Sequence, residues 1–262
     1  MMRFPLRLSA ELQRARLARV VRGKSERSLI LQLSAVDAAS SPGGDPQKTI
    51  VKTKSELELL DAVRASAAPV AWIGGAEPLL HSEIGHITRQ ITDNERYVFV
   101  QTDGTQLRRG IFAFRPVPRL FFSVQINGLE KSHDARAGRV GVFGLAMEGI
   151  RAAQLSGFHV CAHTEVDGET DLDELRELRE RLVKMDVDGQ IVSMATNARD
   201  DAASEKVLRE ARKIIGHRGW SAFAEMLEES RENAADVTTR AELTAPRESV
   251  DAESIEESVG AP

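Results

Sequence analysis

The stretch Trp72-Ile73-Gly74-Gly75-Ala76-Glu77-Pro78-Leu79-Leu80-His81-Ser82-Glu83-Ile84 passes from an apolar run into a helical pattern within a few residues. The apolar residues Pro69–Ile73, which lead into it, are typical of a short buried strand. On its far side, apolar side chains recur at helical spacing, at Leu80, Ile84, Ile87 and Ile91. The stretch therefore predicts a strand, a tight glycine turn and a helix in direct succession.

Similar units repeat along the chain. Short apolar runs of strand character alternate with helical patterns, at Ser28–Leu33, Pro69–Ile73, Arg96–Thr102, Arg119–Ile126, Phe158–Thr164 and Gly189–Met194. Ser55 followed by Glu58 is a capping-box signal for a helix that begins there. Strand–helix alternation at this spacing predicts parallel strands with right-handed crossovers, in a doubly wound sheet or a barrel.

The composition indicates a globular protein. A chain of 262 residues, 42% hydrophobic and 29% charged, is long enough for one large α/β domain. No apolar run approaches the roughly 18 residues of a membrane span, and the N-terminus has no hydrophobic signal-peptide core. The single cysteine, Cys161, excludes an intramolecular disulfide and fits a reducing compartment. We therefore expect a cytoplasmic protein.

Charge is distributed unevenly along the chain. Residues 1–30 hold eight basic and two acidic side chains, and residues 236–262 hold seven acidic and two basic ones. The body between them is acidic too, which argues against a nucleic-acid-binding surface. Residues 1–22 interleave apolar residues with arginines. They either lie weakly on the anionic inner face of a membrane or pack their apolar side onto the folded body.

The turn at residues 72–84 resembles the Gly-Gly-Glu-Pro turn of radical S-adenosylmethionine (SAM) enzymes. Further segments continue the resemblance in order: Gln101-Thr102-Asp103-Gly104-Thr105, Ser123-Val124-Gln125-Ile126-Asn127-Gly128-Leu129, His133-Asp134, Arg139, Gly141-Val142-Phe143, Ile150-Arg151-Ala152-Ala153, Gly157-Phe158 and Val187-Asp188-Gly189. A glycine turn before a helix is common, so the resemblance rests on the ordered series. It covers residues 5–195 and is most similar to the hopanoid-associated, adenosyl-hopene transferase type.

This resemblance implies a partial (β/α)6 barrel of the radical SAM kind. In this interpretation residues 1–27 form a basic N-terminal helix, and residues 28–233 form the barrel. After Asn233 the chain has almost no large apolar residues. Such a segment cannot bury enough surface to offset the entropy of ordering it. We therefore expect residues 234–262 to be a disordered acidic tail.

The chain departs from the family where the family holds its iron–sulfur cluster. Radical SAM enzymes have a Cys-x3-Cys-x2-Cys loop after the first strand, and its three thiolates bind a 4Fe–4S cluster. The corresponding segment here, Ser34–Pro46, contains no cysteine. Hydroxyl and carboxylate oxygens are poor replacements for thiolates on such a cluster. We therefore predict that the 4Fe–4S cluster is absent and that the chain performs no radical SAM chemistry.

Polar side chains gather on one face of the predicted strands. Side chains alternate between the two faces of a strand, so apolar residues such as Val98 and Phe122 face the helices and polar ones face the interior. The resemblance implies that Glu77 meets the amino group of a ligand and Arg139 its carboxylate. The predicted ligand-binding residues are Gly74, Gly75, Glu77, Gln101, Asp103, Ser123, Gln125, Asn127, Arg139 and His163. The ligand would be SAM or a related nucleotide. The alternative is an inherited interior that is filled by water or satisfied by itself.

The histidines do not predict a metal site. His159 and His163 share one face of a strand but lie about 13 Å apart along it, so they cannot bind the same ion. His81 and His86, five residues apart on a helix, do not share a face. His133-Asp134 is predicted to form a turn. We therefore assign no metal ligand and no catalytic residue.

Three classes of function remain open. The pattern favours a pseudoenzyme, a non-catalytic binding or accessory protein that retains a polar pocket. Its partner would be a small-molecule ligand or an active radical SAM paralogue, in a pathway of the hopanoid or lipid type. The alternative is an enzyme that uses the pocket for cluster-independent chemistry. The third is a decayed product that keeps only the fold.

Overall fold

The computed structural model describes residues 2–21, 28–40, 49–196, 198 and 202–244. Its strands form a seven-stranded sheet in the order β2-β1-β3-β4-β5-β6-β7. They are β1 Ile30–Ser40, β2 Thr49–Thr53, β3 Val70–Gly75, β4 Tyr97–Thr102, β5 Leu120–Gln125, β6 His159–Val166 and β7 Gly189–Met194. β1 and β2 are antiparallel, and all the remaining neighbouring pairs are parallel. The predicted barrel strands are confirmed, in a sheet that is not closed.

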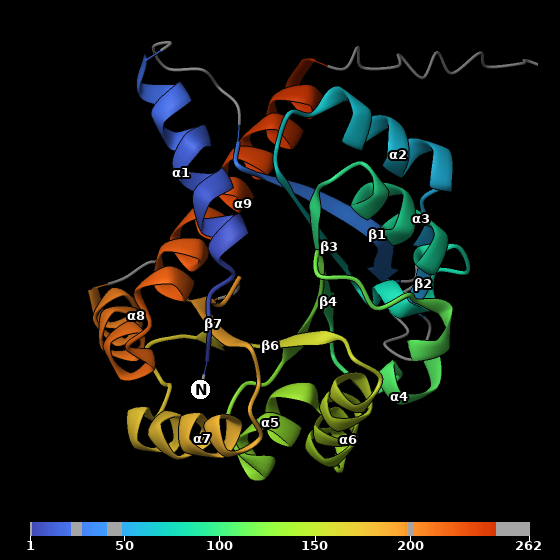
Figure 1. Cartoon of the computed structure of the whole chain (residues 1–262). Coiled ribbons are helices and arrows are strands. Elements are labelled where there is room, and N and C mark those ends of the chain that lie inside the picture. Colours follow the sequence, from blue (N-terminus) through green and yellow to red (C-terminus); the bar gives the residue numbers. More distant parts are fainter. Residues whose placement is uncertain (1, 22–27, 41–48, 197, 199–201, 245–262) are drawn as a thin grey trace, which may run out of the picture.

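Helices cover both sides of this curved sheet (Figure 1). The outer layer consists of α2 Glu56–Ala65, α3 Ile84–Asp93, α4 Leu107–Gly110, α6 Val142–Leu155, α7 Leu172–Lys184 and α8 Ala202–Ile215. Short 3-10 turns, η1 Pro78–Leu80 and η2 Ile111–Ala113, lie beside them, and α5 Glu130–Ala137 packs against α6. The inner side holds α1 Leu6–Val21 and α9 Arg218–Thr244.

The alternation of strand side chains divides the core into two clusters. Val98, Phe122 and Val160 belong to the outer cluster, which includes residues of the surrounding helices. The neighbouring positions Phe99, Phe121 and Cys161 belong to the inner cluster. The prediction of which strand residues face the helices is therefore confirmed. The inner face differs from the prediction towards the amino ends of β4 and β5, where Phe99 and Phe121 make it aromatic rather than polar.

Helix α9 spans the opening between the two ends of the parallel sheet. It packs against both β1 and β7, and Trp220 and Phe223 are fully buried in the inner cluster. Gln32 Nε2 on β1 donates a hydrogen bond of 2.7 Å to Ser230 Oγ. On the opposite side, the backbone N–H of Met194 donates one of 2.8 Å to Glu228 Oε1. The chain's own helix therefore fills much of the space that an open barrel would leave.

The basic N-terminal helix also packs on the inner side. Leu8 and Leu12 of α1 are buried in the inner cluster, whereas Arg7, Arg14 and Arg16 are exposed. This arrangement supports the alternative in which the apolar side of the segment packs onto the body. Residues 22–27 of the predicted helix lie outside the described residues. Among the helices that are described, none has the length and apolar character needed to cross a membrane.

Two predicted boundaries are wrong. Helix α9 continues to Thr244, so residues 234–244 are helical and do not belong to a disordered tail. Residues 245–262 lie outside the described residues. Strand β1 continues to Ser40 and pairs with β2, where a loop was predicted from Ser34. Ala35 and Val36 explain the extension of β1, because both are fully buried.

Candidate functional site

The glycine turn after β3 is tightly packed against β1. Gly75 has φ of +108°, a conformation that residues with a side chain rarely adopt, and an added Cβ would lie 2.3 Å from the carbonyl oxygen of Val36. The next backbone N–H, of Ala76, donates a hydrogen bond of 2.7 Å to that same oxygen. The positive φ and the close contact with Val36 thus require glycine at position 75. The turn brings Glu77 to the carboxyl ends of the parallel strands.

Glu77 is held by the chain itself. Its carboxylate accepts hydrogen bonds from the backbone N–H of Leu79 at 2.9 Å, the hydroxyl of Thr102 at 2.9 Å and the backbone N–H of Asp103 at 3.0 Å. Burial raises the pKa of Glu77 to about 7, although these hydrogen bonds act to lower it. Through these hydrogen bonds the carboxylate links the turn after β3 to the end of β4. Glu77 does not line the pocket described next.

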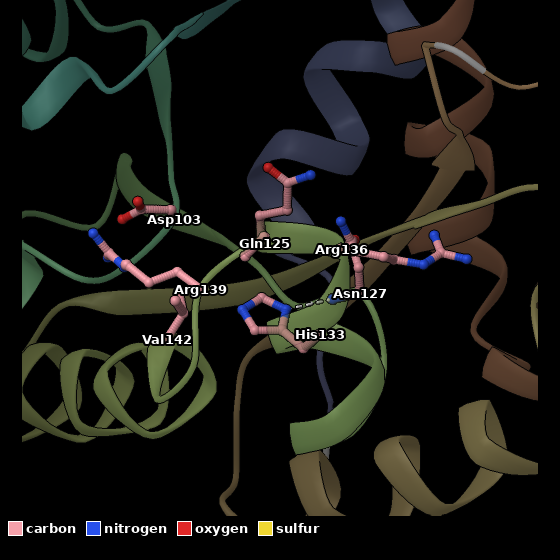
Figure 2. A pocket seen from close by; sticks show the side chains of 8 residues that line it. Asp103, Gln125, Asn127, His133, Arg136, Arg139 and Val142 are labelled. Carbon is pink, nitrogen blue, oxygen red and sulfur yellow. Dashed lines mark hydrogen bonds between the residues drawn. The ribbon is translucent and has the colours of Figure 1, made fainter. Parts of the chain in front are cut away.

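A pocket of about 380 Å³ lies beyond the carboxyl ends of β4 and β5 (Figure 2). Its lining includes four residues that were predicted separately as ligand-binding positions, Asp103, Gln125, Asn127 and Arg139. The other lining residues are His133, Arg136, Ala137 and Val142. In parallel α/β folds, ligands bind at the carboxyl ends of the strands, and this is the edge where the pocket opens.

Opposite charges stand on two sides of the pocket. Oδ1 of Asp103 accepts hydrogen bonds from the backbone N–H and the hydroxyl of Thr105, each at 2.8 Å. Arg139 is exposed and extends along the pocket towards Asp103 (Figure 2). Within the described part of the chain, no carboxylate lies within ion-pair distance of its guanidinium. Arg139 is thus a cation that is available to a ligand.

Asp134 fixes the loop that holds Arg139. Its carboxylate accepts hydrogen bonds from the backbone N–H groups of Gly141 at 2.5 Å and Phe143 at 2.8 Å, at the start of α6. These hydrogen bonds lower the pKa of Asp134. The backbone N–H of Arg139 donates to the carbonyl of Asp134 at 3.1 Å. The turn predicted at His133-Asp134 is wrong, because both residues lie within helix α5, where the Asp134 carboxylate anchors the Arg139 loop.

Two pocket residues, His133 and Arg136, were not predicted from the sequence. Arg136 is held on the far side of the pocket by hydrogen bonds to Glu165 O, Asp167 Oδ1 and Thr170 Oγ1, at 3.1 to 3.2 Å. His133 is buried and accepts a hydrogen bond of 3.1 Å at Nδ1 from the backbone N–H of Asn127. The position of His133 six residues after Asn127, shortly beyond the end of β5, was the available signal.

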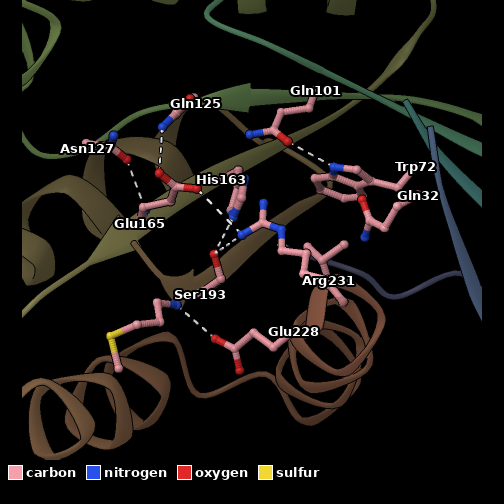
Figure 3. A network of polar contacts seen from close by, with 12 residues as sticks. Gln32, Trp72, Gln101, Gln125, Asn127, His163, Glu165, Ser193, Glu228 and Arg231 are labelled. Atoms are coloured by element: carbon pink, nitrogen blue, oxygen red, sulfur yellow. Dashed lines mark hydrogen bonds and ion pairs between the residues drawn. The ribbon is translucent and has the colours of Figure 1, made fainter. Parts of the chain in front are cut away.

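The remaining predicted positions lie deeper in the interior, away from the pocket lining (Figure 3). Gln101 Oε1 accepts a hydrogen bond of 2.9 Å from Trp72 Nε1. His163 is fully buried, and its Nε2 lies 2.7 Å from Ser193 Oγ. Burial lowers the pKa of His163 well below its usual value, so the ring is neutral. The Gln101 contact fits the self-satisfied interior that was the alternative to a ligand cavity, whereas Nδ1 of His163 has no hydrogen-bond partner among the described residues.

Ser123 and Gly74 complete the set of predicted residues. Ser123 is buried, and its hydroxyl has no hydrogen-bond partner within the described residues. Gly74 lies beside Gln101, whose Oε1 would be 3.3 Å from an added Cβ. The structure thus brings four of the predicted residues together around one pocket and leaves the others in the turn or the interior.

The chain has no set of thiolates for an iron–sulfur cluster. Cys161, its single cysteine, is fully buried in the inner cluster on β6. Burial raises the pKa of this thiol well above its usual value, which disfavours the thiolate. Serine and aspartate occupy the segment where the resemblance places the cluster loop. The donor set therefore does not fit a 4Fe–4S cluster.

One group of metal-ligand side chains lies elsewhere on the described surface. Glu56, Glu83 and His86 have ligand atoms within 4.8 Å of one another, and His86 Nδ1 lies 2.5 Å from Glu56 Oε1. The sequence assigned no chemistry to His86. Glu83 and His86 are exposed, and such groups are common on protein surfaces without a metal. We assign no function to this group.

The comparisons with known proteins concern the fold. No protein-family model matches the chain, and no curated protein matches it in sequence. Solved structures do match. Streptococcus suis SuiB bound to S-adenosylmethionine is similar with a TM-score of 0.55 and 13% identity, over 78% of this chain and 48% of that one. Another structure of SuiB gives a TM-score of 0.52 and 12% identity, over 77% and 50% of the two chains.

This chain thus spans about half the length of the SuiB structures it matches. A structure of TYW1 with a lysine–pyruvate adduct bound matches with a TM-score of 0.47 and 13% identity, over 70% of each chain. At these identities the likeness to SuiB concerns the arrangement of the backbone alone. The chain has a mixed α/β fold of the radical SAM barrel type, with an open seven-stranded sheet.

Proposed function

We propose that this protein binds a small adenosyl compound, SAM or a relative of it, without a 4Fe–4S cluster and without radical chemistry. The observation that supports this most is the pocket at the carboxyl ends of β4 and β5. Asp103, Gln125, Asn127 and Arg139 were predicted as ligand-binding residues from three segments of the sequence, and they line the same cavity. Its volume of about 380 Å³ lies in the range of small-molecule pockets.

The charges of the pocket suit a zwitterionic ligand. Arg139 offers a guanidinium to a carboxylate, and Asp103 offers a carboxylate to an ammonium group. In this proposal Asp103 takes the role that the resemblance gives to Glu77, because the Glu77 carboxylate already accepts three hydrogen bonds. The side chains of Gln125 and Asn127 then offer hydrogen bonds to the polar groups of the nucleoside.

The cysteine content supports a non-catalytic role. A cluster needs three protein thiolates, and the chain has a single, fully buried cysteine. The helix α9, packed into the opening of the barrel, leaves less space for a large substrate in the interior. We therefore favour a binding or accessory protein. Its link to an active paralogue and to hopanoid-type lipid synthesis rests on the sequence resemblance.

Ligand binding tests this proposal. Titration of the full chain with SAM, S-adenosylhomocysteine or 5′-deoxyadenosine should raise the melting temperature, because a ligand that binds the folded state stabilises it by mass action. Isothermal titration calorimetry then gives the affinity. Replacing Arg139 by Ala should weaken the binding of SAM and S-adenosylhomocysteine.

A matched control is Arg151→Ala, which removes an exposed arginine on α6 outside the pocket lining. This variant should bind like the wild type. If millimolar concentrations of all three compounds leave the melting temperature of the wild type unchanged, the proposal is wrong and the pocket is an inherited cavity.

A further inference from the structure

One ring nitrogen of His133 has no hydrogen-bond partner among the residues that the structure describes. Its Nδ1 accepts a hydrogen bond of 3.1 Å from the backbone N–H of Asn127. A backbone N–H can only donate, so Nδ1 carries no proton, and the proton of a neutral ring is on Nε2. Within the described residues, Nε2 is buried and has no hydrogen-bond partner. The Nε2–H group of His133 is thus a hydrogen-bond donor that has no acceptor among the described residues.

This donor belongs to the pocket wall. The imidazole lies among the lining residues, and in Figure 2 its second nitrogen is on the side of the ring away from Asn127, towards Arg139. His133 is only 5% exposed as a residue, and its ring packs edge-on against Phe143, with ring centroids 5.8 Å apart. A buried donor without an acceptor is rare in folded proteins, because water no longer satisfies it. A ligand oxygen would satisfy it.

The charges around His133 select the kind of acceptor. Arg139 and Arg136 line the same pocket, and Arg139 has no ion-pair partner among the described residues. Burial lowers the pKa of His133, so the neutral ring with its Nε2–H donor is the form present at neutral pH. A neutral donor that lines the same pocket as this guanidinium is suited to an anionic group, whose oxygens can accept a hydrogen bond from each.

We propose that His133 is a ligand-binding residue, whose Nε2–H donates a hydrogen bond to a carboxylate or phosphate oxygen that Arg139 also binds. This inference rests on the proposed function and adds a residue and a chemical requirement to it. The ligand must carry an anionic oxygen at the end of the pocket near α5. An adenosyl compound without such a group loses this contact.

The His133→Asn variant distinguishes the role of Nδ1 as an acceptor from the role of Nε2–H as a donor. The Asn side-chain oxygen occupies the position of Nδ1 and still accepts the hydrogen bond from Asn127, whereas the Nε2–H donor is lost. His217→Asn is a matched control, since Nδ1 of His217 also accepts a backbone N–H, from Trp220 at 3.4 Å, outside the pocket. Melting temperatures of both variants report whether they fold.

Calorimetry with three ligands provides the test on the full chain. S-adenosylhomocysteine carries a carboxylate, AMP carries a phosphate, and 5′-methylthioadenosine carries neither. His133→Asn should weaken the binding of the first two about tenfold and leave the third unchanged, because only the anionic ligands use the donor. Equal weakening of all three ligands, or no weakening of the anionic ones, would overturn the inference while leaving the proposed function in place.

If none of the three ligands binds the wild type, the proposed function fails, and a second measurement decides the role of His133. Two-dimensional ¹H–¹⁵N spectra of the histidine side chains follow Nε2 of His133 during titration with sodium phosphate and with sodium acetate. A saturable shift of this resonance that disappears in Arg139→Ala supports an anion site. No shift of Nε2 with either salt overturns it. The same spectra decide the question if His133→Asn does not fold.

Discussion

Arg231 Nη1 on α9 lies 3.6 Å from Glu165 Oε1 at the end of β6, and both side chains are largely buried, with exposed fractions of 26% and 15%. Glu165 Oε2 in turn accepts a hydrogen bond of 3.0 Å from Gln125, which lines the pocket (Figure 3). The helix that packs across the opening of the sheet is therefore joined to the candidate ligand site through charged and polar groups.

The Arg231–Glu165 pair should stabilise the packing of α9. Arg231→Met leaves the Glu165 carboxylate partly buried without its cation, and we expect a loss of about 2 kcal/mol in the free energy of unfolding. Urea denaturation measures this loss. Glu165→Gln is the partner variant, and the double variant should lose less than the sum of the two. Strict additivity would contradict a direct interaction between the two side chains.

Gly189 at the start of β7 should tolerate no side chain. A Cβ added there would lie 2.1 Å from Cε2 of the fully buried Trp220. Gly189→Ala should therefore displace α9 and lower the free energy of unfolding by about 2 kcal/mol or more. The matched control is Gly144→Ala on α6, where an added Cβ meets nothing within 4 Å. It should be neutral or stabilising by up to about 1 kcal/mol. Equal effects of the two changes in urea denaturation would contradict the packing of Trp220.

Glu77 should make the protein less stable as the pH rises. Its pKa is about 7 in the folded chain, against the usual 4.5 of a glutamate, because the carboxyl is buried. Between these two values the folded state binds more protons than the unfolded state, so the free energy of unfolding falls as the pH rises from 4.5 to 7. The contribution is of the order of 3 kcal/mol. Urea denaturation across this range, compared with Glu77→Gln, isolates it. An equally steep dependence in the variant would contradict the prediction.

Much of the fold could be predicted because its signals are local. The run Arg119–Ile126 is rich in apolar residues and alternates apolar and polar ones from Phe122 onward, and β5 occupies Leu120–Gln125 within it. The capping box at Ser55 and Glu58 is present, with both reciprocal hydrogen bonds. The turn at Gly75 follows its strand as predicted. Each of these features depends on residues close in the sequence.

The placement of α9 could not be predicted, because it depends on contacts with residues far away in the chain. The apolar residues Trp220–Leu227 indicate a helix, but not that it packs inside the sheet. Ser230 lies 198 residues from its hydrogen-bond partner Gln32. Separation in sequence also explains why the partners of the interior residues could not be predicted. Gln101 and His163 face inwards as predicted, but Trp72 and Ser193 bind them there.

The candidate site was predicted in part for a similar reason. Asp103, Gln125 and Asn127 lie at or just after the ends of the neighbouring parallel strands β4 and β5, so their proximity follows from the fold. His133 was missed because its role depends on which of its nitrogens the backbone of Asn127 occupies. Glu77 was predicted to face a ligand. The three donors that occupy it come from η1 and the end of β4, which only the folded chain brings together.

We propose that this radical SAM-type fold binds its ligand without an iron–sulfur cluster. Anaerobic reconstitution of the full chain with iron and sulfide, followed by iron analysis and absorbance near 400 nm, tests it most directly. With one buried cysteine, we expect no stoichiometric iron, no absorbance band after desalting and no cleavage of SAM on addition of dithionite. Close to four irons per chain together with reductive cleavage of SAM would show that the chain binds a 4Fe–4S cluster and would contradict a cluster-free function.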